Sequence, residues 1–191
     1  MIDNLYSQFN KHPNIGVACL YADYNDQSNQ TLNHILGSFL RQFLSSAPGT
    51  IPSEILDKLR DIRRRGGKPG TDDNIAMLKT RLHQLKRAFI CLDAIDELEQ
   101  SVRWRLLKIL KELGTNNACL FLTGRHHIQN EVQKYFQVVE RYIVNISATQ
   151  QDIQEFVKQQ IEQDRELNPE AMNEVLAKDI IDAVFKKSRG M

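Results

Sequence analysis

Asp93, Asp96 and Glu97 place three carboxylates within five positions of the chain, directly after the uncharged run Ala88–Leu92. Carboxylates this close repel one another unless a positive group joins them. Mg²⁺ suits such a cluster, because it takes one or two carboxylates and keeps coordination positions for phosphate oxygens. The same acids also suit the first turn of a helix, where they offset free backbone N–H groups. This stretch alone therefore leaves a metal site and a helix start equally open.

The run Ala88–Leu92 predicts the strand that positions these acids. It shows no polar alternation, which is typical of a strand buried on both faces of a parallel sheet. Such a strand delivers its last side chain, here Asp93, to the carboxyl edge of the sheet, where open α/β folds bind ligands.

Three more apolar runs predict strands at residues 15–22, 118–122 and 142–146. Amphipathic stretches between them predict helices, since leucine, isoleucine and phenylalanine recur three or four positions apart. Strand and helix alternate four times, which predicts an α/β fold with a parallel sheet and right-handed crossovers. No strand signal follows residue 146. We therefore expect an α/β domain over residues 1–147 and the start of a helical subdomain over residues 148–191.

Composition limits the class of protein. The chain has 191 residues, 41% of them apolar and 26% charged, as in an ordinary soluble domain. Its net charge of +1 gives no argument for binding nucleic acid or an acidic membrane, and no apolar run approaches the ~20 residues that span a bilayer. Cys19, Cys91 and Cys119 have no paired spacing, which is typical of buried thiols in a reducing compartment. We expect a cytoplasmic protein.

The basic segment Arg63–Thr71 contains glycines, a lysine and a threonine in the wrong order for a phosphate-binding loop. That loop needs Gly, four residues and then Gly-Lys-Ser/Thr, between a strand and a helix. Here a proline follows the lysine and a predicted helix precedes the segment. We interpret the segment as a solvated basic loop, and the complete motif occurs nowhere in the sequence.

Several segments follow one another in an order that is typical of one known family. They are Tyr21–Tyr24 with Gln30–Thr31 and a leucine-rich helix ending near Arg41–Gln42, Ile90–Glu97, Leu120–Arg125, Ser147–Ala148 with Asp152–Ile153, and Gly190–Met191. Together they resemble a NACHT-type nucleoside triphosphatase, in the signal-transduction branch of the P-loop ATPases, and are most similar to its fungal and nephrocystin-type members. The resemblance implies a three-layer P-loop sheet that binds Mg²⁺ with ATP or GTP.

The resemblance also implies a role for each residue of the site. Asp93 would hold Mg²⁺ through water, and Asp96 and Glu97 would orient the attacking water or complete the metal shell. Arg125 would read the γ-phosphate, with Thr123 beside it as a nucleotide-binding residue. The family usually has Thr-Ser-Arg-Pro where this chain has Thr123-Gly124-Arg125-His126, so the aim of the arginine stays open. A structural pairing of Arg125 with Asp93 or Asp23 is the alternative.

The absent phosphate-binding loop is the main departure from the family. Relative to the family, the chain begins inside the phosphate-binding helix, at Ile2–Phe9. The strand before that helix would lie between the strands at residues 118–122 and 142–146. Without the loop's N–H groups and its lysine, this chain would supply half of a site and would be inactive alone.

Two functions from different classes follow. The first is a nucleotide-dependent signalling switch, whose partners are the nucleotide and either other proteins or further copies of the module. The second is a non-catalytic module that docks a partner protein through an open sheet edge or its helical tail. A metal-dependent nuclease is disfavoured, because no lysine lies beside the acids and no basic face accompanies them.

Overall fold

The structure is a computed structural model and describes residues 2–9, 12, 14–46, 51–114, 117–136, 142–146, 149–167 and 173–188. The chain forms two compact units, Met1–Glu140 and Arg141–Met191.

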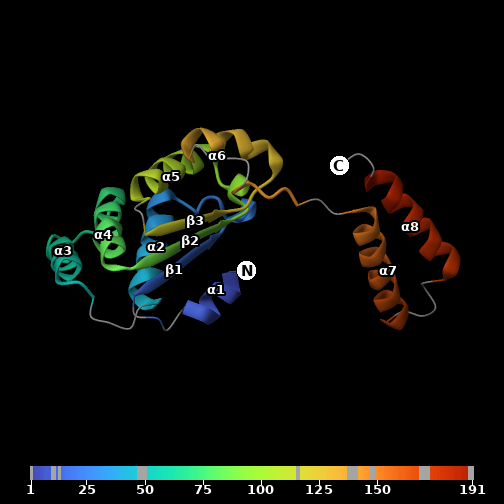
Figure 1. Cartoon of the computed structure of the whole chain (residues 1–191), viewed down its shortest axis with the longest axis horizontal. Coiled ribbons are helices and arrows are strands. Elements are labelled where there is room, and N and C mark those ends of the chain that lie inside the picture. Colours follow the sequence, from blue (N-terminus) through green and yellow to red (C-terminus); the bar gives the residue numbers. More distant parts are fainter. Residues whose placement is uncertain are drawn as a thin grey trace. The chain divides into compact units, whose positions relative to one another are not determined.

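Among its described residues, unit 1 has a parallel sheet of three strands, β1 (Ile15–Tyr21), β2 (Arg87–Asp93) and β3 (Ala118–Leu122). The strands lie in the order β1-β2-β3 (Figure 1). Tyr21 is the register partner of Asp93, and Leu92 is the partner of Leu122. The three strands therefore end at one edge of the sheet, and the predicted α/β fold with a parallel sheet is confirmed.

Helices lie on both faces of the sheet. In chain order, unit 1 has α1 (Ile2–Phe9), η1 (Tyr24–Asp26), α2 (Leu32–Ser46), α3 (Ser53–Arg64), α4 (Thr71–Gln84), η2 (Ile95–Glu97), α5 (Gln100–Leu113), η3 (His126–Ile128) and α6 (Gln129–Phe136), where η marks a short 3₁₀ turn. Figure 1 shows α1 apart from the other helices. Its Phe9 ring stacks on Phe89 of β2, with ring centroids 5.5 Å apart.

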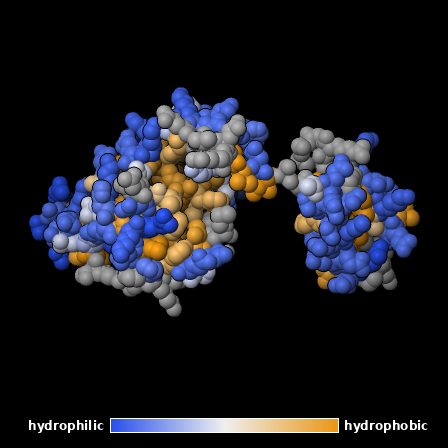
Figure 2. Space-filling view, viewed as in Figure 1, coloured by the Kyte–Doolittle hydropathy of each residue, from blue (hydrophilic) through white to orange (hydrophobic). Residues whose placement is uncertain are grey.

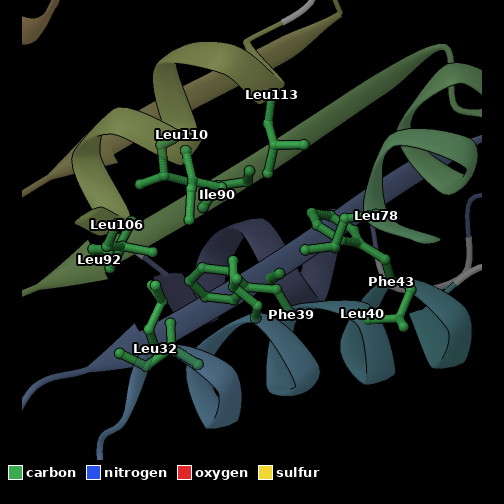
Figure 3. Close-up of a cluster of buried hydrophobic side chains, with 14 of the residues drawn as sticks. Leu32, Phe39, Leu40, Phe43, Leu78, Ile90, Leu92, Leu106, Leu110 and Leu113 are labelled. Atoms are coloured by element: carbon green, nitrogen blue, oxygen red, sulfur yellow. The ribbon is translucent and has the colours of Figure 1, made fainter. Parts of the chain in front are cut away.

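The core lies on the other face, between the sheet and helices α2, α4 and α5. Ile90 and Leu92 of β2 point into it, because alternate residues of a strand share a face. Figure 3 shows the helical side chains that meet them: Leu32, Phe39, Leu40 and Phe43 of α2, Leu78 of α4, and Leu106, Leu110 and Leu113 of α5. These are the residues of the predicted amphipathic stripes, so burial of those stripes holds the helices on the sheet.

One side chain pairs with the backbone of Cys19 on the outer edge of β1. The side-chain amide of Gln42, in α2, accepts a hydrogen bond from the Cys19 N–H at 2.9 Å and donates one to the Cys19 carbonyl at 2.9 Å. An unpaired strand edge is open to pairing with another chain. Gln42 gives Cys19 the partners that a fourth strand would otherwise supply.

The prediction of a strand at residues 142–146 is wrong. These residues form no strand, and Tyr142, Val144 and Ile146 are exposed at 68%, 79% and 92%. A strand requires a neighbour with which its N–H and C=O groups can pair. The neighbour implied by the resemblance is not among the strands predicted from this sequence, so apolar composition alone does not make this segment a strand.

The described residues of unit 2 form the helices α7 (Gln150–Leu167) and α8 (Glu174–Ser188), in which Ile161 and Ala177 are buried. The sequence Thr149–Asp152 starts α7 as a capping box. Asp152 N donates to Thr149 Oγ1 at 3.1 Å, and Thr149 N donates to Asp152 Oδ2 at 2.8 Å. Across the described part of the chain, no helix has both the length and the apolar character needed to cross a bilayer.

Candidate functional site

The carboxyl edge of the sheet brings the predicted site residues together. Backbone hydrogen bonds join the strand ends, from Ala22 N to the Asp93 carbonyl at 3.0 Å and from Thr123 N to the Leu92 carbonyl at 2.9 Å. Ile95 N donates to the Thr123 carbonyl at 3.0 Å. Asp93, the η2 turn and Thr123 thus form a continuous strip, which we call the acid rim: Asp93, Asp96, Glu97, Thr123 and Arg125.

Thr123 fixes the orientation of the Asp93 carboxylate. Its hydroxyl donates a hydrogen bond to Asp93 Oδ1 and accepts one from Ala94 N at 2.9 Å. Both capacities of the hydroxyl are used within the protein, and Oδ2 of Asp93 accepts no hydrogen bond from the described residues. Thr123 therefore acts on Asp93, and Asp93 keeps one oxygen for a further ligand.

Ala94 turns the chain sharply out of β2. Its backbone is left-handed, with φ 53° and ψ 43°, which costs a residue with a Cβ roughly 1–2 kcal/mol. It is the one non-glycine residue with positive φ among the described residues. The Thr123 hydroxyl helps to hold this conformation, so one contact fixes both Asp93 and the turn that follows it.

Asp96 pairs with Arg125. The Asp96 side chain is only 5% exposed and accepts Arg125 N at Oδ1, 3.1 Å away, while Oδ2 lies 3.5 Å from Arg125 Nε. The sequence suggests Asp93 or Asp23 as the structural partner of Arg125, but Arg125 pairs with Asp96. The rest of the arginine reaches outward, since its side chain is 76% exposed.

Gly124 permits this close approach. A Cβ at Gly124 would lie 2.5 Å from Ile128 Cδ1 and 3.2 Å from Asp96 Oδ1. The serine that the resemblance implies at this position would therefore require Ile128 to shift. Glycine avoids that shift.

Glu97 links the acid rim to the loop after β1. Its Oε2 accepts a hydrogen bond from Tyr24 N at 3.2 Å, and its carbonyl accepts one from Gln27 Nε2 at 2.7 Å. Asp23 serves the same loop, where its Oδ1 accepts the Asn25 N–H at 2.8 Å and caps η1. Glu97 and Asp23 thus hold neighbouring turns in place.

Two residues of this region escaped the sequence reasoning. Arg103 of α5 is buried, with 8% exposure, and forms an ion pair with Glu131 of α6 at 3.1 Å. A sequence signal does exist for Arg103, because it stands three and four positions before Leu106 and Leu107 on the apolar stripe of α5. A charged residue on a buried stripe needs a partner, but the sequence does not identify Glu131 as that partner.

The donor set of the acid rim fits Mg²⁺ better than a metal enclosed by protein ligands. No group of three or more His, Cys, Asp or Glu side chains surrounds a common point in the described residues. One free carboxylate oxygen on Asp93 is the kind of contact that Mg²⁺ makes when water and phosphate oxygens fill its other positions.

The fold and the acid rim place this chain in the class of α/β proteins that have a parallel sheet with acidic side chains and an arginine at its carboxyl edge. Residues 1–125 match the sequence model of the family described as Nephrocystin 3, N-terminal, and the chain belongs to this family. The match ends at Arg125, so it includes every residue of the acid rim. Comparisons with curated proteins and with solved structures gave no match.

Proposed function

We propose that this chain is the acid-bearing part of a NACHT-type nucleotide-binding switch, which holds the Mg²⁺ of ATP or GTP at Asp93. The observation that carries the proposal is the Asp93 carboxylate: Thr123 holds Oδ1, and Oδ2 accepts no hydrogen bond from the residues that the structure describes. It lies in the same strip as the Asp96–Arg125 pair. The free Asp93 oxygen suits a positive metal ion, and the outward-reaching Arg125 guanidinium suits a negative triphosphate.

Each side chain has a distinct role in this proposal. Mg²⁺, when bound, neutralises charge on the phosphate oxygens. Asp93 positions that ion, and Thr123 holds Asp93. Arg125 would contact the terminal phosphate, which would compete with Asp96 for the guanidinium. An Arg125 guanidinium that turned to phosphate would release Asp96 Oδ2 to orient water, while Oδ1 still accepts the Arg125 N–H. Glu97 keeps the loop after β1 beside the site. The chain by itself lacks the N–H cradle and lysine of a phosphate-binding loop, so we expect weak binding of Mg·ATP and no measurable hydrolysis.

Manganese titration of the unsubstituted chain tests the metal role. Mn²⁺ is a paramagnetic substitute for Mg²⁺ and broadens the NMR signals of nearby amides. We expect early broadening at residues 93–97 and 123–125, and its loss in Asp93→Asn. Asp57→Asn, at an exposed carboxylate of α3, is the matched control and should leave the pattern unchanged. Broadening that does not depend on Asp93 would contradict the proposed metal role. Micromolar Mg·ATP binding in calorimetry would contradict the expectation that this chain supplies only part of the site.

A groove beside β3 favours a second function, docking of a partner protein. A cavity of about 220 Å³ lies between β3, α5 and α6. Its lining is mostly apolar, from Leu110, Lys111, Gly114, Ala118, Leu120, Tyr135 and Phe136. Figure 2 shows apolar residues gathered over the strands of unit 1. A module that uses only this groove would leave Mn²⁺ broadening at the acid rim weak and independent of Asp93.

A further inference from the structure

The Arg103 guanidinium donates hydrogen bonds to two backbone carbonyls and to one carboxylate. Nη1 donates to the Leu98 carbonyl at 3.0 Å and to the Asp96 carbonyl at 3.4 Å. Nε donates to both carboxylate oxygens of Glu131, at 3.2 Å each, and Nη2 donates to Glu131 Oε2 at 3.1 Å. One guanidinium therefore joins the backbone of the η2 turn to the side chain of a residue in α6.

The two carbonyls that Arg103 holds lie on either side of Glu97. The Asp96 carbonyl belongs to the peptide unit between Asp96 and Glu97, and the Leu98 carbonyl to the unit after Leu98. Holding both limits movement of the short segment that carries the Asp96 and Glu97 side chains. Glu131 carries the same connection to α6, which follows directly after Arg125 and the η3 turn. Arg103 is thus bonded to the acid turn on one side and to the element behind the arginine turn on the other.

Stability alone is a poor explanation for this buried pair. The Arg103 and Glu131 side chains are 9% and 17% exposed. Removing two charges from water is costly, and well-packed apolar residues in place of a buried ion pair are often neutral or stabilising. What apolar residues lack is the fixed fork of donors that holds two carbonyls and a carboxylate at once.

We infer that Arg103 is a positioning residue for the acid rim, which sets Asp96 and Glu97 relative to Arg125 through the Glu131 pair. The inference rests on the proposed metal–nucleotide role of the rim. Arg103 makes no hydrogen bond to Asp93 and is given no contact with the nucleotide. It acts through the backbone of the η2 turn. The η2 turn follows Asp93 and Ala94 directly, so loss of the forked contact should loosen the end of β2 that positions Asp93. Metal binding should therefore weaken, although the Asp93 carboxylate itself is retained.

Arg81 provides a matched control within the same chain. It is also 8% exposed, and its Nε donates to the Phe43 carbonyl, near the C-terminal end of α2, at 3.1 Å. Its Nη1 reaches Gln84 Oε1 at 3.5 Å. Arg81 is thus a buried arginine that holds a helix end and has no described contact with the acid rim.

The test compares Arg103→Lys with Arg81→Lys in the Mn²⁺ titration. Lysine keeps the charge and loses the fork. We expect Arg103→Lys to weaken Mn²⁺ affinity at the rim by about 10-fold, which is the lower end of the range for loss of a group that supports a metal ligand. We expect Arg81→Lys to leave the Mn²⁺ affinity unchanged. Glu131→Gln, which keeps its shape and loses its charge, should weaken affinity in the same direction and covers the case in which Arg103→Lys does not fold.

Three results would decide against the inference. Unchanged affinity in both Arg103→Lys and Glu131→Gln would overturn it and leave the proposed function standing. Equal weakening in Arg103→Lys and Arg81→Lys would assign the effect to general loosening of the fold, and would overturn it too. Absence of rim broadening in the unsubstituted chain would overturn the proposed function first, and the inference with it.

Discussion

At the scale of single residues, one hydroxyl group holds two neighbouring features of the site. Thr123 Oγ1 donates to Asp93 and accepts from the Ala94 N–H, so it supports both a carboxylate and a left-handed turn. A methyl group in its place would satisfy neither. The sequence resemblance assigned Thr123 directly to the nucleotide, whereas its contacts within the protein favour an indirect role through Asp93.

Thr123→Val tests this role, because valine has nearly the same shape and no hydroxyl. The variant leaves the Ala94 N–H and Asp93 Oδ1 without these partners. We expect the free energy of unfolding to fall by about 1–3 kcal/mol and the Mn²⁺ broadening at residues 93–97 to weaken. Chemical denaturation and the NMR titration measure the two effects.

Two variants complete that experiment. Thr123→Ser retains the hydroxyl and should restore both Mn²⁺ broadening and most of the stability. Thr80→Val removes a hydroxyl that donates only to the Ala76 carbonyl within α4, 3.2 Å away, and should change stability little. A Thr123→Val variant that titrates like the unsubstituted chain would show that Asp93 does not depend on the hydroxyl.

The sequence predicted the members of the acid rim better than their partners. Asp93, Asp96 and Glu97 are close in sequence, so an apolar run followed by acids was sufficient to group them. The partners of Arg125 and Arg103 lie 29 and 28 positions away, and any of several acids could have met them. Steric details such as the missing Cβ at Gly124 select the partner, and these exist only in three dimensions.

At the scale of elements, three of the four predicted strands are present and the fourth is not. A continuous apolar run predicts a strand well where helices cover the sheet, as with β2 and its neighbours. The run at residues 142–146 has similar composition but forms no strand. Strand formation depends on a neighbouring chain segment, which local sequence does not encode. Helices are predicted more reliably from local sequence, because their backbone hydrogen bonds form within the helix itself.

The pairing of Gln42 with the outer edge of β1 gives a prediction at this scale. Gln42→Met keeps the length of the side chain and removes the amide that pairs with both backbone groups of Cys19. We expect a loss of about 1–3 kcal/mol in unfolding free energy, since part-buried backbone groups lose their partners. We also expect self-association at high protein concentration, because the edge becomes available for pairing.

Denaturant titration and analytical ultracentrifugation measure these two outcomes. Gln100→Met, at an exposed position in the first turn of α5, adds the same apolar surface away from a strand edge. It should neither destabilise the chain nor promote association. Equal association of the two variants would point to added apolar surface rather than to an opened strand edge.

At the scale of the whole molecule, each unit has an aspartate that caps a helix. In unit 1, Asp73 Oδ2 accepts the Gly70 N–H at 3.0 Å at the start of α4, and its Oδ1 pairs with Lys58 of α3 at 3.2 Å. In unit 2, Asp152 caps α7 through Thr149. The Gly70 hydrogen bond and then Lys58 lower the pKa of Asp73, and the Thr149 hydroxyl and N–H lower the pKa of Asp152.

Acid unfolding followed by the fluorescence of Trp104, the single tryptophan, reports on unit 1. Because folding lowers the pKa of Asp73, its stabilising effect is complete above the ordinary aspartate value of about 3.9 and is lost as the pH falls through the lower folded value. Asp73→Asn removes this titration. We therefore expect the variant's stability to depend less steeply on pH below that ordinary value. Asp152→Asn should leave the Trp104 curve unchanged, since that cap lies in unit 2. If Asp73→Asn and the unsubstituted chain lost stability in parallel through this range, the capping contact would not be what acid removes.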